Sequence, residues 1–445
     1  MKVIVLGAGI IGVSTAWHLL NEGHDVTVVD RQPDAALETS FANGAQISVS
    51  FCEPWANAGA PFKVAKWLLR DDSPLLFRPK LDPHQWRWGL SFLTQCNDAA
   101  FERNVRQLVA LGRYSHESLK GVVAATGIQY ERLERGILHF FSSQADFEAG
   151  AAGAELMRKY GVDRRVMDRD AVLKVEPALA AFGPNIHGGT FTPSDESGDA
   201  QVFTQKLAAL CRARGATFLH STAIERIDTL GGQISGVRVR SLADGAKAPV
   251  RTLVADQYVA AMGSYTAPML RQLGIWLNIY PAKGYSATLK LKRPQDASVV
   301  SLLDDTRKIA ISRLGDHIRI AGTAELAGYD TSLDGATAQK RCAALVRRYE
   351  ELFPGVADLS QPNYWTGLRP STPTNIPYIG RSSLPNLWLN AGHGTLGWTH
   401  GAGSGQALAE LISGKRPALS FGFCGESLPA SRPFVPAKRP SAART

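Results

Sequence analysis

The chain has 445 residues, of which 44% are hydrophobic and 20% are charged. These proportions are typical of a soluble globular protein, and the length predicts two or more domains. The apolar run at the N-terminus is too short for the core of a signal peptide, and no stretch reaches the roughly eighteen apolar residues of a membrane span. We therefore expect a cytoplasmic protein, soluble or at most peripheral on the inner face of the cell membrane.

A net charge of +9 would suit a nucleic-acid-binding protein, but much of it lies in one segment. Residues 414–445 hold six basic residues and one acidic residue. Several prolines in residues 418–445 predict a poorly ordered basic tail, and we expect no nucleic-acid partner. The five cysteines are scattered without a CxxC pair, which indicates reduced thiols and no metal site.

The first thirty residues follow the order strand, glycine turn, helix, strand, acid. Lys2–Leu6 is an apolar run of strand length, and Gly7-Ala8-Gly9-Ile10-Ile11-Gly12 follows it. Val13–Leu20 has apolar residues at helical spacing, and a second short apolar run, Asp25–Val29, ends on Asp30. This order is the dinucleotide-binding fingerprint. The alternative is a βαβ unit whose turn holds no ligand.

Each position of the fingerprint has a physical role. Gly7 allows the tight turn, Gly9 lets backbone N–H groups approach a pyrophosphate, and Gly12 lets the helix pack closely on the sheet. Asp30 is placed to accept hydrogen bonds from ribose hydroxyls. A carboxylate there disfavours a 2′-phosphate, so an NADP-like ligand is not expected, although Arg31 follows.

Further elements are predicted in chain order. Residues 38–48 form a loop of small and hydrogen-bonding residues, and the aromatic–basic region 62–93 suits either a domain surface or a bilayer interface. Helices are predicted at 100–125, 148–160 and 200–214, the last capped by Ser197 or Asp199. The apolar strand 257–264 ends in a glycine turn.

The C-terminal half is first rich in strands and then rich in glycine. Strands at 279–280, 285–291, 309–312 and 318–321 predict an antiparallel sheet, and residues 337–353 predict a helix. The Gly-, Pro- and Thr-rich segment 365–380 predicts irregular, stiff backbone. A strand at 387–389 precedes NAGHGTLGWTHGAGSG (390–405), whose glycines open a helix at 404–412.

Two glycine-rich helix entrances, 9–12 and 394–405, lie at opposite ends of the chain. Each offers free N–H groups and a helix dipole to an electron-rich ligand. An NAD site would use one entrance. FAD is long enough to use both, with its pyrophosphate at the first and the flavin pyrimidine edge at the second.

The motifs together resemble a known family. The chain is similar to the FAD-dependent amine oxidoreductases of the D-amino-acid oxidase and glycine oxidase type, and more closely to the small subunit of bacterial D-amino-acid dehydrogenase. The resemblance covers the chain to about Pro417. The motifs that carry it are VLGAGIIGVSTAWHL, ETSFANGAQIS, SDESGDAQVFTQ, YPAKGYS, YWTGLRPSTPTNIPYIG and LWLNAGHGTLGWTHGAGSG.

The resemblance implies oxidative deamination of D-amino acids to 2-oxo acids and ammonia. Hydride passes from Cα to flavin N5, and the electrons go to a quinone or another membrane acceptor. The implied fold is α/β: a discontinuous Rossmann-type FAD-binding domain plus an α+β substrate domain with an antiparallel sheet. The expected bounds are 1–80, 193–271 and 360–417 for the first domain, and 81–192 and 272–359 for the second.

The resemblance also implies the residues that contact FAD. They are Val3, Gly7, Gly9, Ile10, Ile11, Gly12, Asp30, Arg31, Ser40, Asn43, Gly44, Gln46, Ile224, Gly263, Gly392, Gly394, Thr395, Leu396, Gly397, Trp398 and Thr399. Sarcosine oxidases attach FAD through a cysteine, but the region 365–400 has none, so non-covalent FAD is expected.

Arg369 is the candidate anchor for the substrate carboxylate, because a guanidinium binds carboxylate in a bidentate manner. The arginine of this motif has that role in glycine oxidase. An interdomain ion pair is the alternative. Tyr280, Lys283 and Tyr285 are candidates to face the substrate over the flavin, although packing tyrosines fit as well. Hydride transfer needs a neutral substrate amine but no protein base, so His393 is interpreted as a flavin-side or structural residue.

The sequence departs from the dehydrogenase pattern in two places. Asn43-Gly44-Ala45 stands where Asn-Ala-Gly is usual, and Thr374-Asn375-Ile376 replaces an acid and a glycine. The second change removes a charge and adds bulk, which favours a cyclic substrate such as D-proline or hydroxy-D-proline over D-alanine. Two other functions stay open: an oxidase of glycine, sarcosine or proline type, and a non-catalytic FAD-binding electron-transfer subunit.

Overall fold

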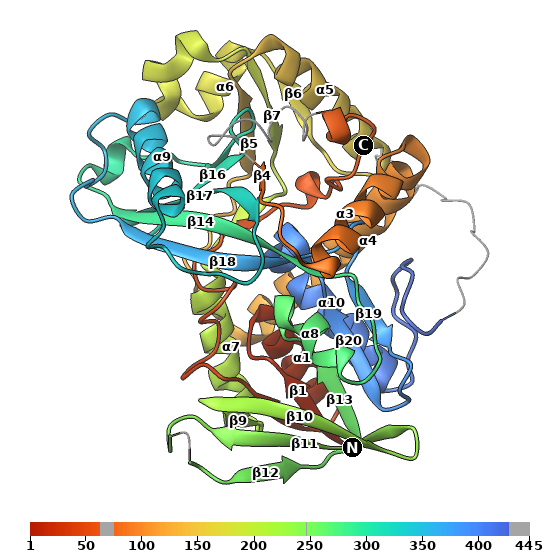
Figure 1. The fold of residues 1–445 in the computed structure, drawn as a ribbon. Helices are drawn as coiled ribbons and strands as arrows, with labels where there is room; N and C mark the ends of the chain where they lie inside the picture. The colour runs from red at the N-terminus through yellow and green to blue at the C-terminus, as the bar shows by residue number, and fades with distance from the viewer. Residues whose placement is uncertain (63–74, 246, 427–445) are drawn as a thin grey trace, which may run out of the picture.

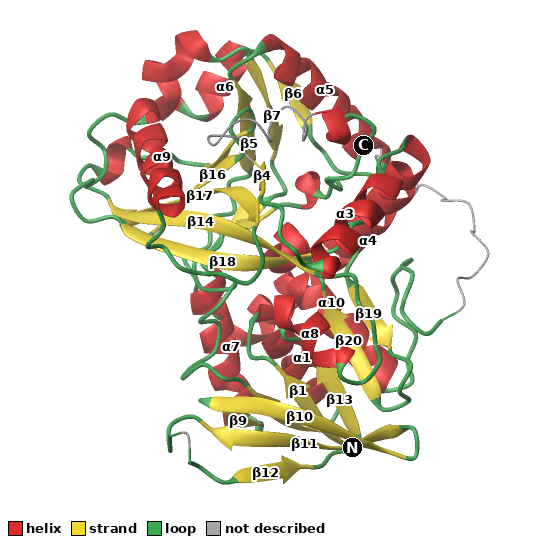
Figure 2. Ribbon diagram, in the orientation of Figure 1, coloured by secondary structure: helices red, strands yellow, loops and turns green. Residues whose placement is uncertain are grey.

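The computed structural model describes residues 1–62, 75–245 and 247–426. Its strands form two main sheets with helices between and around them (Figure 1). Figure 2 shows a large sheet with β14 and β18 at one end of the molecule and a three-stranded sheet with β10 to β12 at the other. A parallel sheet and its helices lie between them.

The parallel sheet is built from segments that are far apart in sequence. Its strand order is β19 (Tyr378–Arg381), β20 (Leu387–Ala391), β13 (Gln257–Ala260), β1 (Lys2–Leu6), β2 (Asp25–Val29) and β9 (Thr217–Leu219). All neighbours are parallel except β19, which runs antiparallel to β20. Short apolar strands with both faces buried are typical of such sheets.

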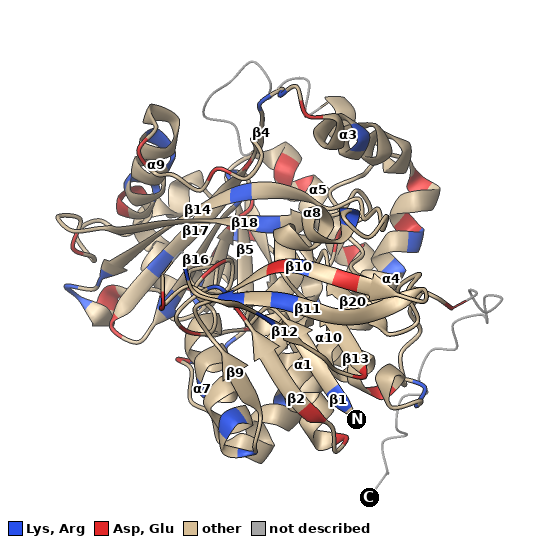
Figure 3. Ribbon diagram, turned by 60° about the horizontal axis from the view of Figure 1, so that its bottom comes forward, with Lys and Arg blue, Asp and Glu red and all other residues tan. Residues whose placement is uncertain are grey.

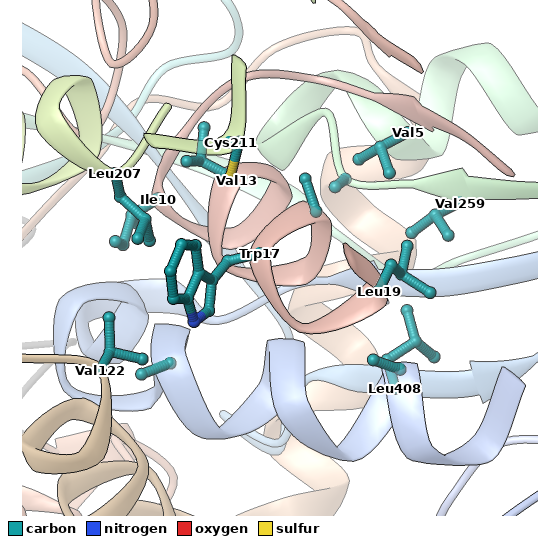
Figure 4. Packing of buried hydrophobic residues seen from close by; sticks show 14 of the residues in the cluster. Val5, Ile10, Val13, Trp17, Leu19, Val122, Leu207, Cys211, Val259 and Leu408 are labelled. Atoms are coloured by element: carbon teal, nitrogen blue, oxygen red, sulfur yellow. The ribbon is translucent and has the colours of Figure 1, made fainter. Parts of the chain in front are cut away.

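Different layers cover the two faces of this sheet. Val3 and Val5 pack in a core with helices α1 (Ile10–Asn21), α7 (Ala200–Ala213) and α10 (Gly397–Ile412). The alternating residues Ile4 and Leu6 pack against the antiparallel sheet of β10 (Thr222–Leu230), β11 (Gln233–Ser241) and β12 (Val250–Leu253). Figure 4 shows Trp17 and Leu19 of α1 inside the helical layer, with Leu408 of α10 close to Leu19.

The outer face of the three-stranded sheet carries paired charges. Arg238 pairs with Asp228 at 2.5 Å, and Arg240 pairs with Glu225 at 2.7 Å. Figure 3 shows acidic residues on β10 facing basic residues on β11. Opposite charges across neighbouring strands stabilise the pairing of β10 with β11 modestly.

The large sheet has nine strands. Its order is β18 (Asn363–Ser371), β14 (Tyr280–Lys290), β17 (His317–Leu326), β16 (Ile309–Leu314), β15 (Ser301–Asp304), β5 (Ile137–Phe141), β7 (Gly188–Thr192) and β6 (Arg165–Met167), with β4 (Leu75–Phe77) beside β17. Most neighbours are antiparallel, and one face packs on α9 (Ala336–Leu352) and α6 (Arg169–Val175).

Smaller elements connect these layers. They are β3 (Gln46–Ile47) paired with β8 (Glu196–Ser197), α3 (Pro83–Gln95), α4 (Asp98–Thr126), α5 (Gln144–Lys159) and α8 (Thr266–Arg271). In the described residues, no helix is long and apolar enough to cross a membrane. The predicted helices at 100–125, 148–160, 200–214 and 337–353 correspond to α4, α5, α7 and α9, and Asp199 caps α7 through the N–H groups of Gln201 and Val202.

The predicted fold class is confirmed, since a parallel Rossmann-type sheet and a mainly antiparallel sheet are both present. The domain bounds stay a prediction. Two strands from ranges assigned to the FAD-binding domain, β4 from 1–80 and β18 from 360–417, belong to the large sheet. Part of the predicted interfacial region 62–93 lies outside the described residues.

Three local predictions were wrong. The segment predicted as irregular, 365–380, begins within strand β18, which runs to Ser371 and whose Pro370 pairs with Pro281. The strands predicted at 279–280 and 285–291 are one strand, β14. The helix predicted to begin at 404 begins at Gly397.

Tertiary packing explains the longer helix α10. A Cβ at Gly403 would overlap Ser115 of α4, and a Cβ at Gly405 would lie 2.7 Å from backbone atoms of α1. The glycines that lower the helix propensity of this segment are thus the residues that let two helices approach it.

Candidate cofactor and substrate site

Four neighbouring strands of the parallel sheet end in predicted cofactor residues. Going along the sheet, β20 is followed by Gly392, β13 by Gly263, β1 by Gly7 and β2 by Asp30. Ligands of open parallel sheets bind at the carboxyl ends of the strands. One edge of the sheet therefore joins the two glycine-rich segments that the sequence places almost four hundred residues apart.

The three glycines of the first turn are required for different reasons. Gly7 has φ +112°, and a Cβ there would lie 2.5 Å from the Ala261 carbonyl oxygen. A Cβ at Gly12 would overlap the Gly7 carbonyl. A Cβ at Gly9 would meet only the Ser40 hydroxyl, at 3.4 Å. The chain itself requires Gly7 and Gly12, whereas Gly9 leaves its backbone open to a ligand.

Polar groups surround the start of α1. The Ile10 N–H donates to Ser40 Oγ at 3.1 Å, and the Asp30 carboxylate accepts from the N–H groups of Ala8 (2.6 Å) and Gln32 (2.8 Å). Burial raises the pKa of Asp30. Arg31 pairs with Glu38 and lies 4.0 Å above the Tyr265 ring. Asp30 is held in place with carboxylate lone pairs left to accept from ribose hydroxyls.

The second helix entrance contains buried polar atoms without partners. Gly392 (φ +89°) and Gly394 (φ +54°) turn the chain from β20 into α10. His393 lies between them, and both of its ring nitrogens lack a hydrogen-bond partner among the described residues, as does Asn390 Oδ1. Burial lowers the pKa of His393 to about 3, so the ring is neutral at physiological pH. Such orphaned atoms fit a polar ligand at this turn.

The loop 38–48 ties this edge to the large sheet. Thr39 donates to the Leu368 carbonyl at 2.9 Å, Ser312 donates to the Gly44 carbonyl at 2.8 Å, and Gln46 Nε2 donates to Ser301 Oγ at 2.9 Å. The predicted contacts Gly44 and Gln46 therefore also hold the two sheets together. Asn43 accepts from the N–H of Ala45 at 2.9 Å, which closes the loop locally.

A buried carboxylate fixes the end of the same loop. Asp195 accepts from the hydroxyls of Ser48 (2.7 Å) and Ser50 (2.6 Å), and burial raises its pKa. The Ser48 N–H donates to Thr399 Oγ1 of α10 at 3.1 Å. These bonds join the acidic turn, the loop and the second helix entrance into one unit.

Arg369 is a partly buried cation that has no anionic partner among the described residues. It lies on β18, and its Nη1 donates to the Thr323 carbonyl at 2.9 Å. No ion pair of the described residues includes Arg369. Burial lowers the pKa of its guanidinium to about 10, which still leaves it charged at neutral pH. A charge in this position is costly unless a ligand carboxylate compensates it.

The backbone around Arg369 is adapted to its side chain. The guanidinium lies over Gly284 of β14, where a Cβ would overlap it. Thr323 has φ +56°, a left-handed conformation that is strained for a β-branched residue, and it lies at the irregularity in the pairing of β14 with β17. A glycine inside a strand signals a close approach of this kind. Gly284 and Thr323 are site residues that the sequence reasoning did not single out.

Lys283 and Tyr285 are not brought together with Arg369. Successive side chains of β14 point to opposite faces, and Gly284 marks the face that carries Arg369. Tyr285 packs in the core that contains α9, and its hydroxyl donates to Glu325 at 2.6 Å. Burial beside Glu325 raises the Tyr285 pKa. Lys283 Nζ donates to the Ser332 carbonyl at 2.7 Å.

Tyr280 lies on the same face of β14 as Ala282. Because Ala282 pairs directly with Arg369 of β18, the side chains of Tyr280 and Arg369 point to the same face of the sheet. Its ring packs with Trp88 and Phe92. Burial and nearby Asp82 raise the pKa of its hydroxyl. Of the three β14 candidates, Tyr280 alone shares a face with the proposed carboxylate anchor.

The other predicted cofactor residues fall into two groups. Gly263, Thr395 and Gly397 lie at the carboxyl edge with backbone or side chain accessible, and Ile224 packs beside the ends of β1 and β2. Val3 lies at the opposite end of β1, and Leu396 and Trp398 pack in apolar cores. The Trp398 indole donates to the Gly198 carbonyl at 3.0 Å.

The departure at 374–376 has a local explanation. Asn375 has φ +60°, a conformation that asparagine tolerates well, and its Oδ1 accepts from the N–H of Trp55 at 2.9 Å. Ile376 packs against the apolar cluster of Val49 and Leu396. The bulk of Ile376 therefore contributes to packing.

Three features define the class of protein, which is a two-sheet oxidoreductase of flavin type. The dinucleotide fingerprint and the second helix entrance share one sheet edge, and the adjoining mixed sheet carries an arginine without an ion-pair partner among the described residues. Residues 2–411 match the family described as "FAD dependent oxidoreductase". The chain belongs to this FAD-dependent oxidoreductase family, which confirms the expected resemblance, the cofactor FAD and an enzyme of oxidoreductase type.

Two curated relatives illustrate the similarity. The chain is 50% identical over 423 residues to a D-amino acid dehydrogenase of Dechloromonas aromatica (strain RCB), covering 95% of this chain and 99% of that protein. It is 44% identical to a D-amino acid dehydrogenase of Methylobacterium radiotolerans, covering 94% and 97% of the two chains.

Solved structures share the fold at low identity. Glycine oxidase from Bacillus cereus ATCC 14579 has a TM-score of 0.69 and 20% identity, covering 94% of this chain and 96% of that one. L-proline dehydrogenase from P. horikoshii has a TM-score of 0.71 and 16% identity, covering 94% of both.

Proposed function

We propose that this protein oxidises D-amino acids to 2-oxo acids and ammonia with non-covalently bound FAD. The observation that carries the proposal is the partly buried Arg369, which has no ion-pair partner among the described residues and fits a substrate carboxylate at the sheet face beside the cofactor edge. The names of the relatives support D-amino acids as the substrate class.

The residues present fit FAD in an extended arrangement. Gly9 and the Ser40 hydroxyl, which accepts from the Ile10 N–H, suit the pyrophosphate at the start of α1, and Asp30 suits the adenosine ribose. The turn from Gly392 to Gly397 suits the flavin end, where the α10 dipole favours negative charge.

The chain's own residues position the substrate. Bound FAD supplies the two-electron acceptor for oxidation of the Cα–N bond, and the resulting imine hydrolyses in water. Arg369 holds the carboxylate in a bidentate pair, which orients Cα. Burial lowers the pKa of His393 and His400 to about 3, so neither ring is suited to take a proton from the amine near neutral pH. Hydride transfer needs the substrate amine neutral, and neither histidine is assigned as its base.

We also propose a quinone or other membrane acceptor, with peripheral membrane contact. Support comes from α3, where Trp86, Leu90 and Leu93 recur at helical spacing and are 48%, 65% and 53% exposed. An exposed apolar helix face with nearby cations suits the bilayer interface.

Two measurements test this proposal. The first compares peroxide formation in air with reduction of a quinone analogue. The second measures co-sedimentation with anionic vesicles for wild type and Leu90→Glu. Exposed Leu230 on β10 supplies the control Leu230→Glu.

An anaerobic bleaching screen tests the central proposal. Purified yellow protein is mixed with D- and L-amino acids, including D-proline and glycine, and flavin absorbance is followed. Bleaching by D-amino acids is expected. Bleaching by L-amino acids alone, or by none, would contradict the proposal and favour a non-catalytic FAD-binding subunit in the second case. FAD released into solution on acid precipitation would support non-covalent binding.

A further inference from the structure

We propose that Trp365 and Phe41 form an apolar wall for the substrate side chain, next to the carboxylate anchor, and that they select D-amino acids with apolar side chains. The proposal rests on the proposed function and names the substrate class within it. Neither residue belongs to the dinucleotide fingerprint or to the second helix entrance.

The register of β14 with β18 places Trp365 beside Arg369. Trp365 and Arg369 alternate along β18 with Gly367 between them, so all three point to the same face. Gly367 is directly opposite Gly284 of β14. A Cβ at Gly367 would overlap the Trp365 indole, and a Cβ at Gly284 would overlap the Arg369 guanidinium.

The indole of Trp365 and the guanidinium of Arg369 thus lie side by side, each over one of two directly opposed glycines. Directly opposed residues of antiparallel strands have Cα atoms about 4.5–5.5 Å apart. An amino acid whose carboxylate pairs with the guanidinium can span that spacing with the side-chain atoms beyond Cβ. A substrate that pairs with Arg369 therefore brings its side chain within reach of the indole.

Phe41 extends the apolar surface from the other side of the site. Its ring centroid lies 6.1 Å from that of Trp365, with the ring planes at 37°. Phe41 follows Ser40, which contacts the start of α1, and Thr39 joins the same loop to β18 through the Leu368 carbonyl. Phe41 and Trp365 are both only partly buried, although Thr366 and Gly367 next along β18 are buried.

The chemistry of this wall defines the favoured substrates. Indole and phenyl faces bind aliphatic and aromatic groups and offer no charge to an acidic side chain. D-amino acids such as D-leucine, D-methionine and D-phenylalanine gain contact with the wall. D-alanine has too little side chain to gain much, and a D-aspartate side chain would be desolvated without a partner.

The test measures flavin reduction by D-phenylalanine and D-alanine in Trp365→Ala, Trp365→Phe and Phe41→Leu. We expect Trp365→Ala to lower kcat/KM for D-phenylalanine about 10- to 100-fold, mainly through KM, and to change the value for D-alanine much less. Trp365→Phe should recover part of the loss, because it keeps an aromatic face. The exposed Trp276 supplies the matched control Trp276→Ala.

Each outcome has a distinct meaning. An equal loss for both substrates in Trp365→Ala, or no loss, would overturn the wall. Failure of the wild type to react with any D-amino acid would overturn the proposed function instead. The FAD absorbance spectrum separates loss of contact from loss of fold, and Trp365→Phe and Phe41→Leu test the wall if Trp365→Ala does not fold.

Discussion

At the scale of single residues, the partly buried Arg369 is distinguished from two buried, ion-paired arginines of the chain by its surroundings. Arg348 pairs with Asp304 at 2.6 Å and Arg319 pairs with Asp199 at 3.2 Å. Arg369 has only a neutral carbonyl. The paired arginines are neutralised within the fold, whereas Arg369 keeps a charge that a ligand carboxylate can pair with.

Replacing Arg369 with Met should therefore impair substrate binding and leave FAD bound. Loss of a buried charge-assisted pair costs about 2–5 kcal/mol, which corresponds to at least a 30-fold rise in KM. Arg369→Lys should give a smaller rise, since it keeps a charge without the bidentate geometry. Steady-state kinetics with a D-amino acid provides the measurement.

A pair of non-reacting ligands controls this prediction. Wild type should bind a carboxylic acid more tightly than its amide, and Arg369→Met should lose that preference. Unchanged discrimination would show that the carboxylate is held elsewhere.

At the scale of elements, two glycines of the turn before α1 have different roles. Gly12 is needed for the fold, and we expect Gly9 to be needed for cofactor binding. Gly12→Ala places a methyl group on the Gly7 carbonyl and should destabilise the fold severely. Gly9→Ala meets only Ser40 Oγ at 3.4 Å, so apoprotein stability should change little. The methyl group of Gly9→Ala points to the proposed pyrophosphate, and FAD affinity should fall at least tenfold.

Melting of the apoprotein and titration with FAD test both variants. Gly121 in α4 has no atom within 4 Å of an added Cβ, and Gly121→Ala is the matched control. It should keep FAD affinity and stabilise α4 by up to about 1 kcal/mol. Normal FAD affinity in Gly9→Ala would place the pyrophosphate elsewhere.

At the scale of the whole molecule, buried histidines make stability depend on pH. Burial lowers the pKa of four histidines to about 3–4: His18, His139, His393 and His400. In the unfolded chain they take up protons near pH 6.5. Between pH 6.5 and 4 the unfolded state binds more protons, so the free energy of unfolding falls as pH falls.

Urea denaturation at pH 7.5, 6 and 5 measures this loss. Each histidine contributes up to about 1.4 kcal/mol per pH unit below 6.5. His18→Gln removes one such group and should lose stability less steeply than wild type as the pH falls. A gap between wild type and His18→Gln that is the same at all three pH values would contradict this account.

The sequence by itself determined the family, the cofactor and the fold class. A strand, a glycine turn and an acid within thirty residues are local features, and local spacing specifies the βαβ unit that binds a dinucleotide. Arg369 was also predicted from sequence as the carboxylate anchor, because guanidinium chemistry and its motif pointed to the same residue, and that role stays a prediction. Tertiary structure then left Arg369 without a counter-ion.

Only the tertiary structure decided which residues share a face. Lys283 and Tyr285 adjoin Gly284 in sequence, yet strand alternation turns them toward α9 and Glu325. Trp365 lies beside Arg369 because two glycines from strands about eighty residues apart face each other. The sequence placed the start of the C-terminal helix at residue 404, whereas close packing of its glycines on α1 and α4 accompanies a start at Gly397. Strand alternation is a local pattern, whereas long-range register and helix packing set the other two relationships.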